Sequence, residues 1–162
     1  MRRWPVWPRG ALWCLLLGWL ALTGCNRSDA IVVIELHPKN PDILYVATND
    51  YIYKTRDAGQ TWENISRGMT HQRVIALAID PQLPAMIYAG TKGDAVFKSY
   101  DGGHQWRSQR AGLDDVTITS VVNQIVFDPS DTNHLFVATT MGVFESSDGG
   151  DRWEKRMEGM KE

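Results

Sequence analysis

Cysteine is almost absent from the chain: the only two, Cys14 and Cys25, both lie within the first 25 residues. A disulfide framework is therefore excluded for the rest of the chain, and so is a site built on thiolates. The four histidines stand alone, with no His-x-x-x-His pair, no Ser-His-Asp order and no glycine-rich phosphate loop. We expect neither a metal nor a cofactor.

A long hydrophobic run is also missing. The apolar stretch at residues 11–22 has 12 residues, fewer than the roughly 20 that a helix needs to span the hydrocarbon core of a membrane. It follows the basic residues Arg2, Arg3 and Arg9, as in a secretory signal. The segment Leu22-Thr23-Gly24-Cys25 then resembles the bacterial lipobox, in which the chain is cut before the cysteine and the cysteine is acylated.

The lipobox resemblance predicts a signal peptide at 1–24 and a lipidated Cys25 with a short tether at 25–30. The mature chain would be attached to a membrane through its N-terminal acyl groups, palmitate among them. Asn26, where an aspartate would favour the inner membrane, points to the outer membrane of a bacterial cell envelope, facing the periplasm. An ordinary secreted protein with a free thiol at Cys25 and an uncleaved anchor are the alternatives.

Positive charge is scarce in the predicted mature chain. Removal of residues 1–24 takes away three arginines and no acidic residue, so the net charge changes from −2 to −5. This balance argues against nucleic acid as a partner and against electrostatic adhesion to anionic lipid.

Helical periodicity is missing beyond the signal, which excludes a βαβ fold, and one unit is instead repeated three times. Each unit has a proline turn, an apolar strand and a box of the form Ser/Thr-x-Asp-Ala/Gly-Gly-x-x-Trp, at residues 55–62, 99–106 and 146–153. The box tryptophans are 44 and 47 residues apart, the period of a propeller blade.

Four strand-length runs occur in each unit, and in the third they are expected near 122–127, 134–139, 142–147 and 152–157. The sequence thus predicts an all-β domain at 31–162 made of three four-stranded antiparallel blades. The expected blades cover about 31–69, 74–112 and 122–160.

The three boxes resemble the BNR or Asp-box repeat of β-propellers in sialidases, sortilin-type receptors and photosystem II assembly factors. In each box the aspartate can accept backbone N–H groups, the second glycine position suits a positive φ, and the tryptophan buries a large area. We expect each box to close the hairpin between the third and fourth strands of its own blade. The structural box residues are Asp57, Gly59, Trp62, Asp101, Gly103, Trp106, Asp148, Gly150 and Trp153.

Catalytic or metal-binding roles for the three box aspartates are disfavoured, because equivalent positions on successive blades lie apart around a ring. The resemblance implies a binding face opposite the boxes, built by entering loops at 66–73 and 108–121 and by loops at 48–51, 91–95 and 139–142. The candidate contact residues on that face are His71, Gln72, Arg73, Lys92, Asp94, Asp114, Asp115, Thr117 and Thr119. The alternative is that these are ordinary solvated loop residues.

Sialidases of this group need an arginine cluster, a nucleophilic tyrosine with a glutamate partner and an acidic acid/base. The expected innermost strands contain no arginine, and only Arg73 stands at the entrance to one. We therefore predict no catalytic residues and a non-catalytic binding or scaffold module for a protein or glycan, similar to an assembly factor. The alternatives are a sialidase-like glycoside hydrolase, a fragment of one, and a remnant without independent function.

Three blades are fewer than the about 4 to 8 of closed propellers. The first and third blades would each expose an apolar flank of the size that marks an interface. We expect a homodimer with six blades, or completion of the ring by another blade-bearing protein.

Overall fold

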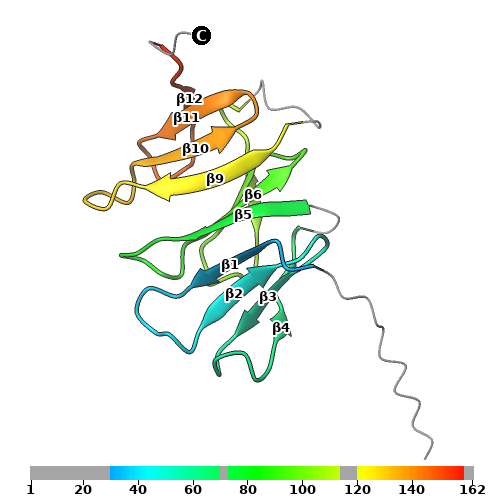
Figure 1. The fold of residues 1–162 in the computed structure, drawn as a ribbon. Coiled ribbons are helices and arrows are strands. Elements are labelled where there is room, and N and C mark those ends of the chain that lie inside the picture. Colours follow the sequence, from blue (N-terminus) through cyan, green and yellow to red (C-terminus); the bar gives the residue numbers. More distant parts are fainter. Residues whose placement is uncertain (1–29, 70–72, 114–119, 159–162) are drawn as a thin grey trace, which may run out of the picture.

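The computed structural model describes residues 30–69, 73–113 and 120–158, and they form three four-stranded antiparallel sheets with the strands in chain order (Figure 1). Blade 1 contains β1 (Val33–Leu36), β2 (Leu44–Ala47), β3 (Ile52–Thr55) and β4 (Glu63–Asn64). Blade 2 contains β5 (Arg73–Ile79), β6 (Ile87–Lys92), β7 (Val96–Ser99) and β8 (Arg107–Gln109). Blade 3 contains β9 (Val122–Phe127), β10 (Leu135–Thr139), β11 (Gly142–Ser146) and β12 (Glu154–Lys155).

This architecture confirms the predicted all-β fold of three antiparallel blades. The strands of blade 3 follow the predicted ranges except the last, which is shorter than the expected 152–157. The Arg152 N–H donates to Asp148 Oδ1 at 2.9 Å, so the box turn uses the residues before Glu154. In the described part of the chain, no helix is long and apolar enough to cross a membrane.

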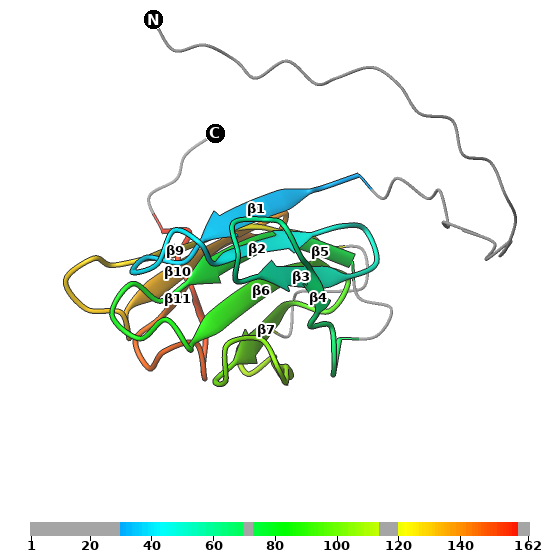
Figure 2. The ribbon, with the colours of Figure 1, turned by 90° about the horizontal axis from the view of Figure 1, so that it is seen from below.

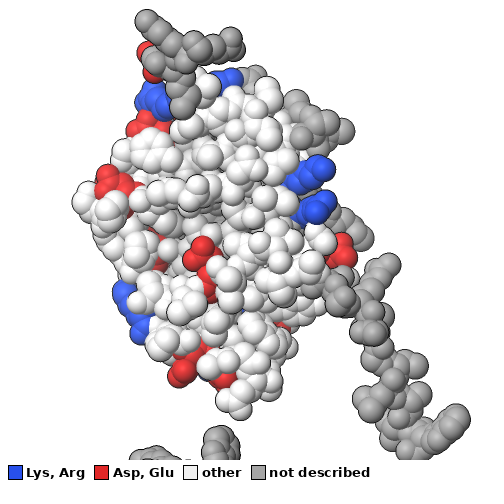
Figure 3. Space-filling model, in the orientation of Figure 1, with Lys and Arg blue, Asp and Glu red and all other residues white. Residues whose placement is uncertain are grey.

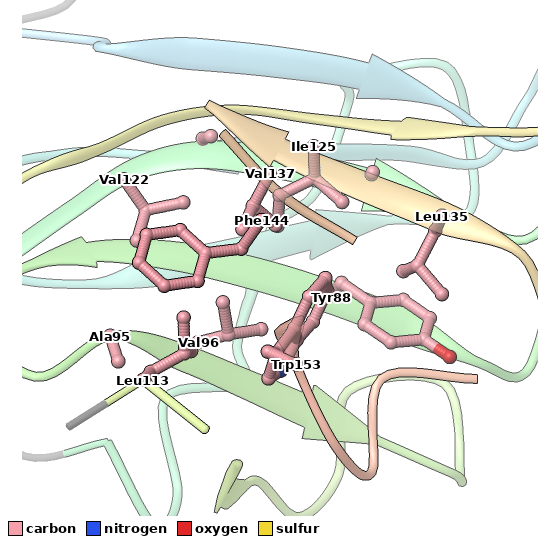
Figure 4. Packing of buried hydrophobic residues seen from close by; sticks show 12 residues of the cluster. Tyr88, Ala95, Val96, Leu113, Val122, Ile125, Leu135, Val137, Phe144 and Trp153 are labelled. Atoms are coloured by element: carbon pink, nitrogen blue, oxygen red, sulfur yellow. The ribbon is translucent and has the colours of Figure 1, made fainter. Parts of the chain in front are cut away.

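The three sheets are stacked face to face, with blade 2 between the other two (Figure 1). Viewed along the stack, β1 lies on one side of the molecule and β7 on the other (Figure 2). One buried cluster joins blades 1 and 2, and a second joins blades 2 and 3. Figure 4 shows the second cluster, in which Tyr88 of β6 lies beside the ring of Trp153.

The two ends of each blade carry different loops. The box turn between the third and fourth strands lies beside the proline turn between the first two, because an N–H of each box donates to a carbonyl of that turn. These bonds run from Ala58 to Asp42, from Gly102 to Ala85 and from Gly149 to Asn133, at 2.8–2.9 Å. The loops between the second and third strands lie at the opposite end of the blades (Figure 1).

Candidate functional site

The three boxes share one set of hydrogen bonds. In blade 2, the Ser99 hydroxyl donates to Asp101 Oδ1 at 2.9 Å, and the Gly103 N–H donates to Ser99 Oγ at 2.9 Å. The Gln105 N–H closes the turn on Asp101 Oδ1 at 2.9 Å. The glycine two residues after each box aspartate has a φ of 85° to 94°, which a residue without Cβ adopts at no steric cost.

Hydrogen bonding keeps the box aspartates ionised. The pKa of Asp57 falls to about 2, chiefly because the Thr55 hydroxyl donates to its carboxylate, followed by the hydroxyl and N–H of Thr61. Burial opposes the same shift at Asp101 and Asp148, but donated hydrogen bonds outweigh it and both pKa values are lowered. A carboxylate held in this way is a poor proton donor near neutral pH, and each of the three lies within its own turn.

The boxes also bind the preceding blade, which the sequence did not indicate. Trp106 Nε1 donates to the Ile65 carbonyl at 2.8 Å, and the Trp106 N–H donates to the Arg67 carbonyl at 3.2 Å. The Trp153 N–H likewise donates to the Ala111 carbonyl at 2.9 Å. A box therefore joins two blades as well as two strands.

The box tryptophans do not all bury a large area, as the motif had led us to expect. Trp106 and Trp153 are 5% and 1% exposed, but Trp62 is 43% exposed. The physical reason is that no described blade packs against the rear of blade 1, so Trp62 Nε1 donates to Gly59 of its own turn at 3.1 Å.

A tyrosine and a lysine on each of the first two blades face the box of the next blade. Lys98 Nζ and the Tyr88 hydroxyl both donate to the Gly149 carbonyl at 2.6 Å. In the equivalent place Lys54 Nζ donates to the Gly102 carbonyl at 3.1 Å and lies 4.9 Å from the centre of the Tyr45 ring. We call this pair the Tyr–Lys clamp.

The clamp residues are buried in spite of their polarity. Lys54 is 7% and Lys98 is 2% exposed. Desolvation lowers the pKa of Lys54, whereas at Lys98 the interactions with Tyr88 and Asp151 outweigh desolvation and raise it. Burial raises the pKa of Tyr45 and of Tyr88 to about 12, so both hydroxyls keep their protons near neutral pH. The sequence signal that could have revealed them is the recurrence of tyrosine and lysine at the same places in the first two repeats.

The candidate binding face lies at the end of the blades opposite the boxes. His71, Gln72, Asp114, Asp115, Thr117 and Thr119 lie outside the described residues, as does Cys25. Among the other candidates, Arg73 and Lys92 are exposed, and Asp94 is half-buried. The structure adds Arg110, which pairs with Asp94.

Arg73 and Lys92 are brought together by the sheet. Their Cα atoms are direct partners between β5 and β6, just before a register shift between Val74 and Ala76. Lysine and arginine side chains gather at this edge of the surface, over the ends of β5 and β6 (Figure 3). Like charges directly opposite each other destabilise an antiparallel pair, and no described side chain forms an ion pair with either cation.

Glu35, in the innermost strand of blade 1, is the one described carboxylate whose pKa is raised, and desolvation by burial is the cause. A raised pKa is the property of a general acid. Glu35 forms no hydrogen bond to a second carboxylate in the described part of the chain. No described group of three or more His, Cys, Asp or Glu side chains is arranged to hold a metal ion.

Comparison with solved structures shows the same fold in parts of larger proteins. An ancestral GH74 enzyme matches with a TM-score of 0.69 at 19% identity, over 80% of this chain and 19% of that one. The GH74 xyloglucanase of Xanthomonas campestris matches with a TM-score of 0.62 at 18% identity, over 81% and 24%. YCF48 bound to D1 peptide matches with a TM-score of 0.58 at 16% identity, over 76% and 39%.

A curated xyloglucanase from Hypocrea jecorina (strain QM6a) is 28% identical over 115 residues. The match covers 68% of this chain but 14% of the xyloglucanase. The chain thus spans a small part of the relatives that it matches.

The model of one protein family matches residues 50–162. This range includes all three boxes and leaves out β1 and β2 of blade 1. With the three-blade fold and the shared box geometry already established, this match identifies the chain as a member of the Sortilin-Vps10 family (sortilin, neurotensin receptor 3).

Proposed function

We propose that the chain is a membrane-anchored, non-catalytic propeller module that binds an anionic segment of a partner protein at the face opposite the boxes. The observation that carries the proposal is the cross-strand pair of exposed cations, Arg73 and Lys92. Their mutual repulsion costs stability, and an anionic ligand would relieve it. The rest of the mature chain is acidic, so this pair is a local exception to its charge.

The predicted anchor fits the orientation of this face. Val33 at the start of β1 pairs with Ala47 at the end of β2, so the chain enters blade 1 at the same end as the loop that follows β2. Acylation of Cys25 would leave residues 25–32 between the acyl groups and β1, a segment that spans at most about 30 Å when extended. The binding face would then lie close to the membrane, and the box face would point away from it.

Binding of synthetic peptides to the purified chain, followed by fluorescence anisotropy at two salt concentrations, tests the proposal. Acidic extended peptides should bind better than basic or neutral ones, and more weakly at higher salt. Arg73→Glu with Lys92→Glu should abolish this preference. The matched control is Arg107→Glu with Arg152→Glu, which makes the same charge change at exposed residues away from the face.

Equal loss of binding in the control variant would show that only net charge matters, and the proposal would then be wrong. Vesicles that contain anionic lipid form a second arm of the experiment. If they bind the wild-type chain and no peptide does, the cations serve membrane contact and not a protein partner.

A glycan-binding or glycoside hydrolase role is the second candidate. It is supported by the identity to the curated xyloglucanase and by the raised pKa of Glu35. Xyloglucan oligosaccharides tested in the same assay separate the two functions, and Glu35→Gln should remove any hydrolysis that is found while leaving peptide binding intact.

A further inference from the structure

Neighbouring blades in this structure meet through two unlike faces. The forward face of a blade is the side that packs on the next blade and carries the Tyr–Lys clamp. The rear face packs on the preceding blade and carries the box carbonyl that accepts from the clamp, Gly102 in blade 2 and Gly149 in blade 3. Both internal contacts follow this rule, so the array of blades has a direction.

The rear face of blade 1 is apolar, and no other described part of the chain covers it. Ile34 and Leu36 are each 55% exposed and Trp62 is 43% exposed. The residues in the same places of blade 2 are covered by blade 1: Leu77, Ile79 and Trp106 are 4%, 8% and 5% exposed. Ile34 and Trp62 line an open groove of about 530 Å³ together with Leu44 and Tyr53. A contiguous apolar surface of this kind marks an interface.

The polar part of this rear face is also left open. Ala58 occupies the place of Gly102 and Gly149 in its box and shares their positive φ, at 55° against 70°. Its N–H donates to Asp42, as theirs do to the proline turns. No described residue donates to the Ala58 carbonyl, whereas the two equivalent carbonyls each accept from a buried lysine.

The forward face of blade 3 does not carry the clamp. Phe136 stands in the place of Tyr88 and Glu145 in the place of Lys98, so the hydroxyl is missing and the ammonium is replaced by a carboxylate. Glu145 is held by His134 Nε2 at 2.6 Å and by Arg156. If a second copy of this chain docked its blade 3 on the rear face of blade 1, the Glu145 carboxylate would face the Ala58 carbonyl. Both groups are acceptors, so a second copy fits this face poorly.

We propose that the rear face of blade 1 binds the forward face of a blade in a partner polypeptide that carries a tyrosine and a lysine in the places of Tyr88 and Lys98. The apolar side chains around Trp62 supply the buried area, and the Ala58 carbonyl selects for the donor pair. This surface is distinct from the Arg73–Lys92 face, and the proposal stands without the proposed function.

The test builds the missing clamp into the chain itself. Phe136→Tyr with Glu145→Lys gives blade 3 the donors of blade 2, and Trp62→Glu in the same chain blocks self-association. This clamp probe is titrated into dye-labelled wild-type chain in mild detergent and followed by analytical ultracentrifugation. It should bind about 10-fold or more tightly than the chain with Trp62→Glu alone, since hydrogen bonds from charged donors are among the stronger ones.

Two controls define the surface and the fold. Leu83→Glu changes an apolar side chain that is 58% exposed away from the rear face, and in the labelled chain it should leave binding unchanged, whereas Trp62→Glu there should remove it. Circular dichroism shows whether the clamp probe is folded. If the clamp probe does not fold, a second variant, Tyr45→Phe with Lys54→Glu, tests the clamp at the contact between blades 1 and 2. It gives blade 1 the phenylalanine and glutamate of blade 3. This variant should lower the urea midpoint more than Arg107→Glu does.

Equal binding of the folded clamp probe and the Trp62→Glu chain would overturn the proposal. So would a wild-type homodimer that is lost with Trp62→Glu, because two copies would then close on each other without the clamp. An unchanged urea midpoint in the Tyr45→Phe, Lys54→Glu chain would also overturn it.

Discussion

Replacement of one box tryptophan at a time separates a residue that closes its own hairpin from one that joins two blades. Trp106 is 5% exposed, packs against blade 1 and donates through Nε1 to the Ile65 carbonyl at 2.8 Å. A buried tryptophan contributes roughly 200 Å² of contact area, which at about 25 cal/mol per Å² is about 5 kcal/mol. Trp106→Ala should therefore cost about 3–5 kcal/mol of unfolding free energy, within the range of other large core truncations.

Trp62 is the matched control because it has the same place in the same motif. It is 43% exposed and its Nε1 donates within its own turn, so its truncation loses about half of the area and leaves no closed cavity. Trp62→Ala should therefore cost about half as much, roughly 1.5–2.5 kcal/mol. Urea unfolding followed by far-ultraviolet circular dichroism measures both values, at two protein concentrations to detect association.

Equal costs for the two variants would refute the reasoning, since they would mean that the preceding blade adds nothing to the stability of a box. A concentration-dependent cost for Trp62→Ala alone would instead reveal a partner copy on the rear face of blade 1.

Three further predictions concern the anchor, a close contact and a titrating group. Palmitate labelling of the chain in bacterial cells should be lost with Cys25→Ala, and label retained in that variant would contradict lipidation at this residue. Gly112→Ala should destabilise the chain by about 2 kcal/mol or more, because its φ is +82° and a Cβ would lie 1.8 Å from the Trp153 carbonyl oxygen. The control is Gly59→Ala, since Gly59 has a φ of +91° but its Cβ would have its nearest atom at 3.6 Å. A thermal melt of this control variant measures the cost of the backbone conformation without a steric clash. The pKa of Asp57 is lowered to about 2 in the folded chain, so its contribution to stability is complete above the ordinary aspartate pKa and is lost as the pH falls from there toward 2. The difference in urea midpoint between wild type and Asp57→Asn should therefore shrink on acidification. A difference that stays constant with pH would contradict the lowered pKa.

The sequence predicts the fold well where one repeat contains the information. The box at 146–153 fixes a turn by local hydrogen bonds, and the runs on either side alternate with the period of strands, so β9, β10 and β11 fall close to their expected ranges. The Arg73 and Lys92 pair was also within reach, because each lies beside a loop expected on the binding face.

Contacts between repeats were not predicted from the motif of a single repeat. Lys54 and Lys98 have the residue type of solvated strand positions, yet they are buried because the box of the next blade covers them. Trp62 and Trp106 have the same motif and opposite exposure, because exposure depends on which blade lies beside each. The close approach of Gly68 and Gly112 to the next blade was not predicted either. A Cβ on Gly68 would lie 2.7 Å from the Trp106 carbonyl oxygen.

The direction of the blade array restricts how it can be extended. When a rear face docks, its box carbonyl leaves water, and without a donor this costs about 1–3 kcal/mol. At both internal contacts a lysine of the Tyr–Lys clamp donates to this carbonyl and removes the cost. Phe136 and Glu145 would leave the carbonyl without a donor and would also bury a carboxylate beside it. Two identical halves would meet this mismatch twice in a six-blade ring, so a partner that carries the clamp closes on blade 1 more favourably than a second copy does.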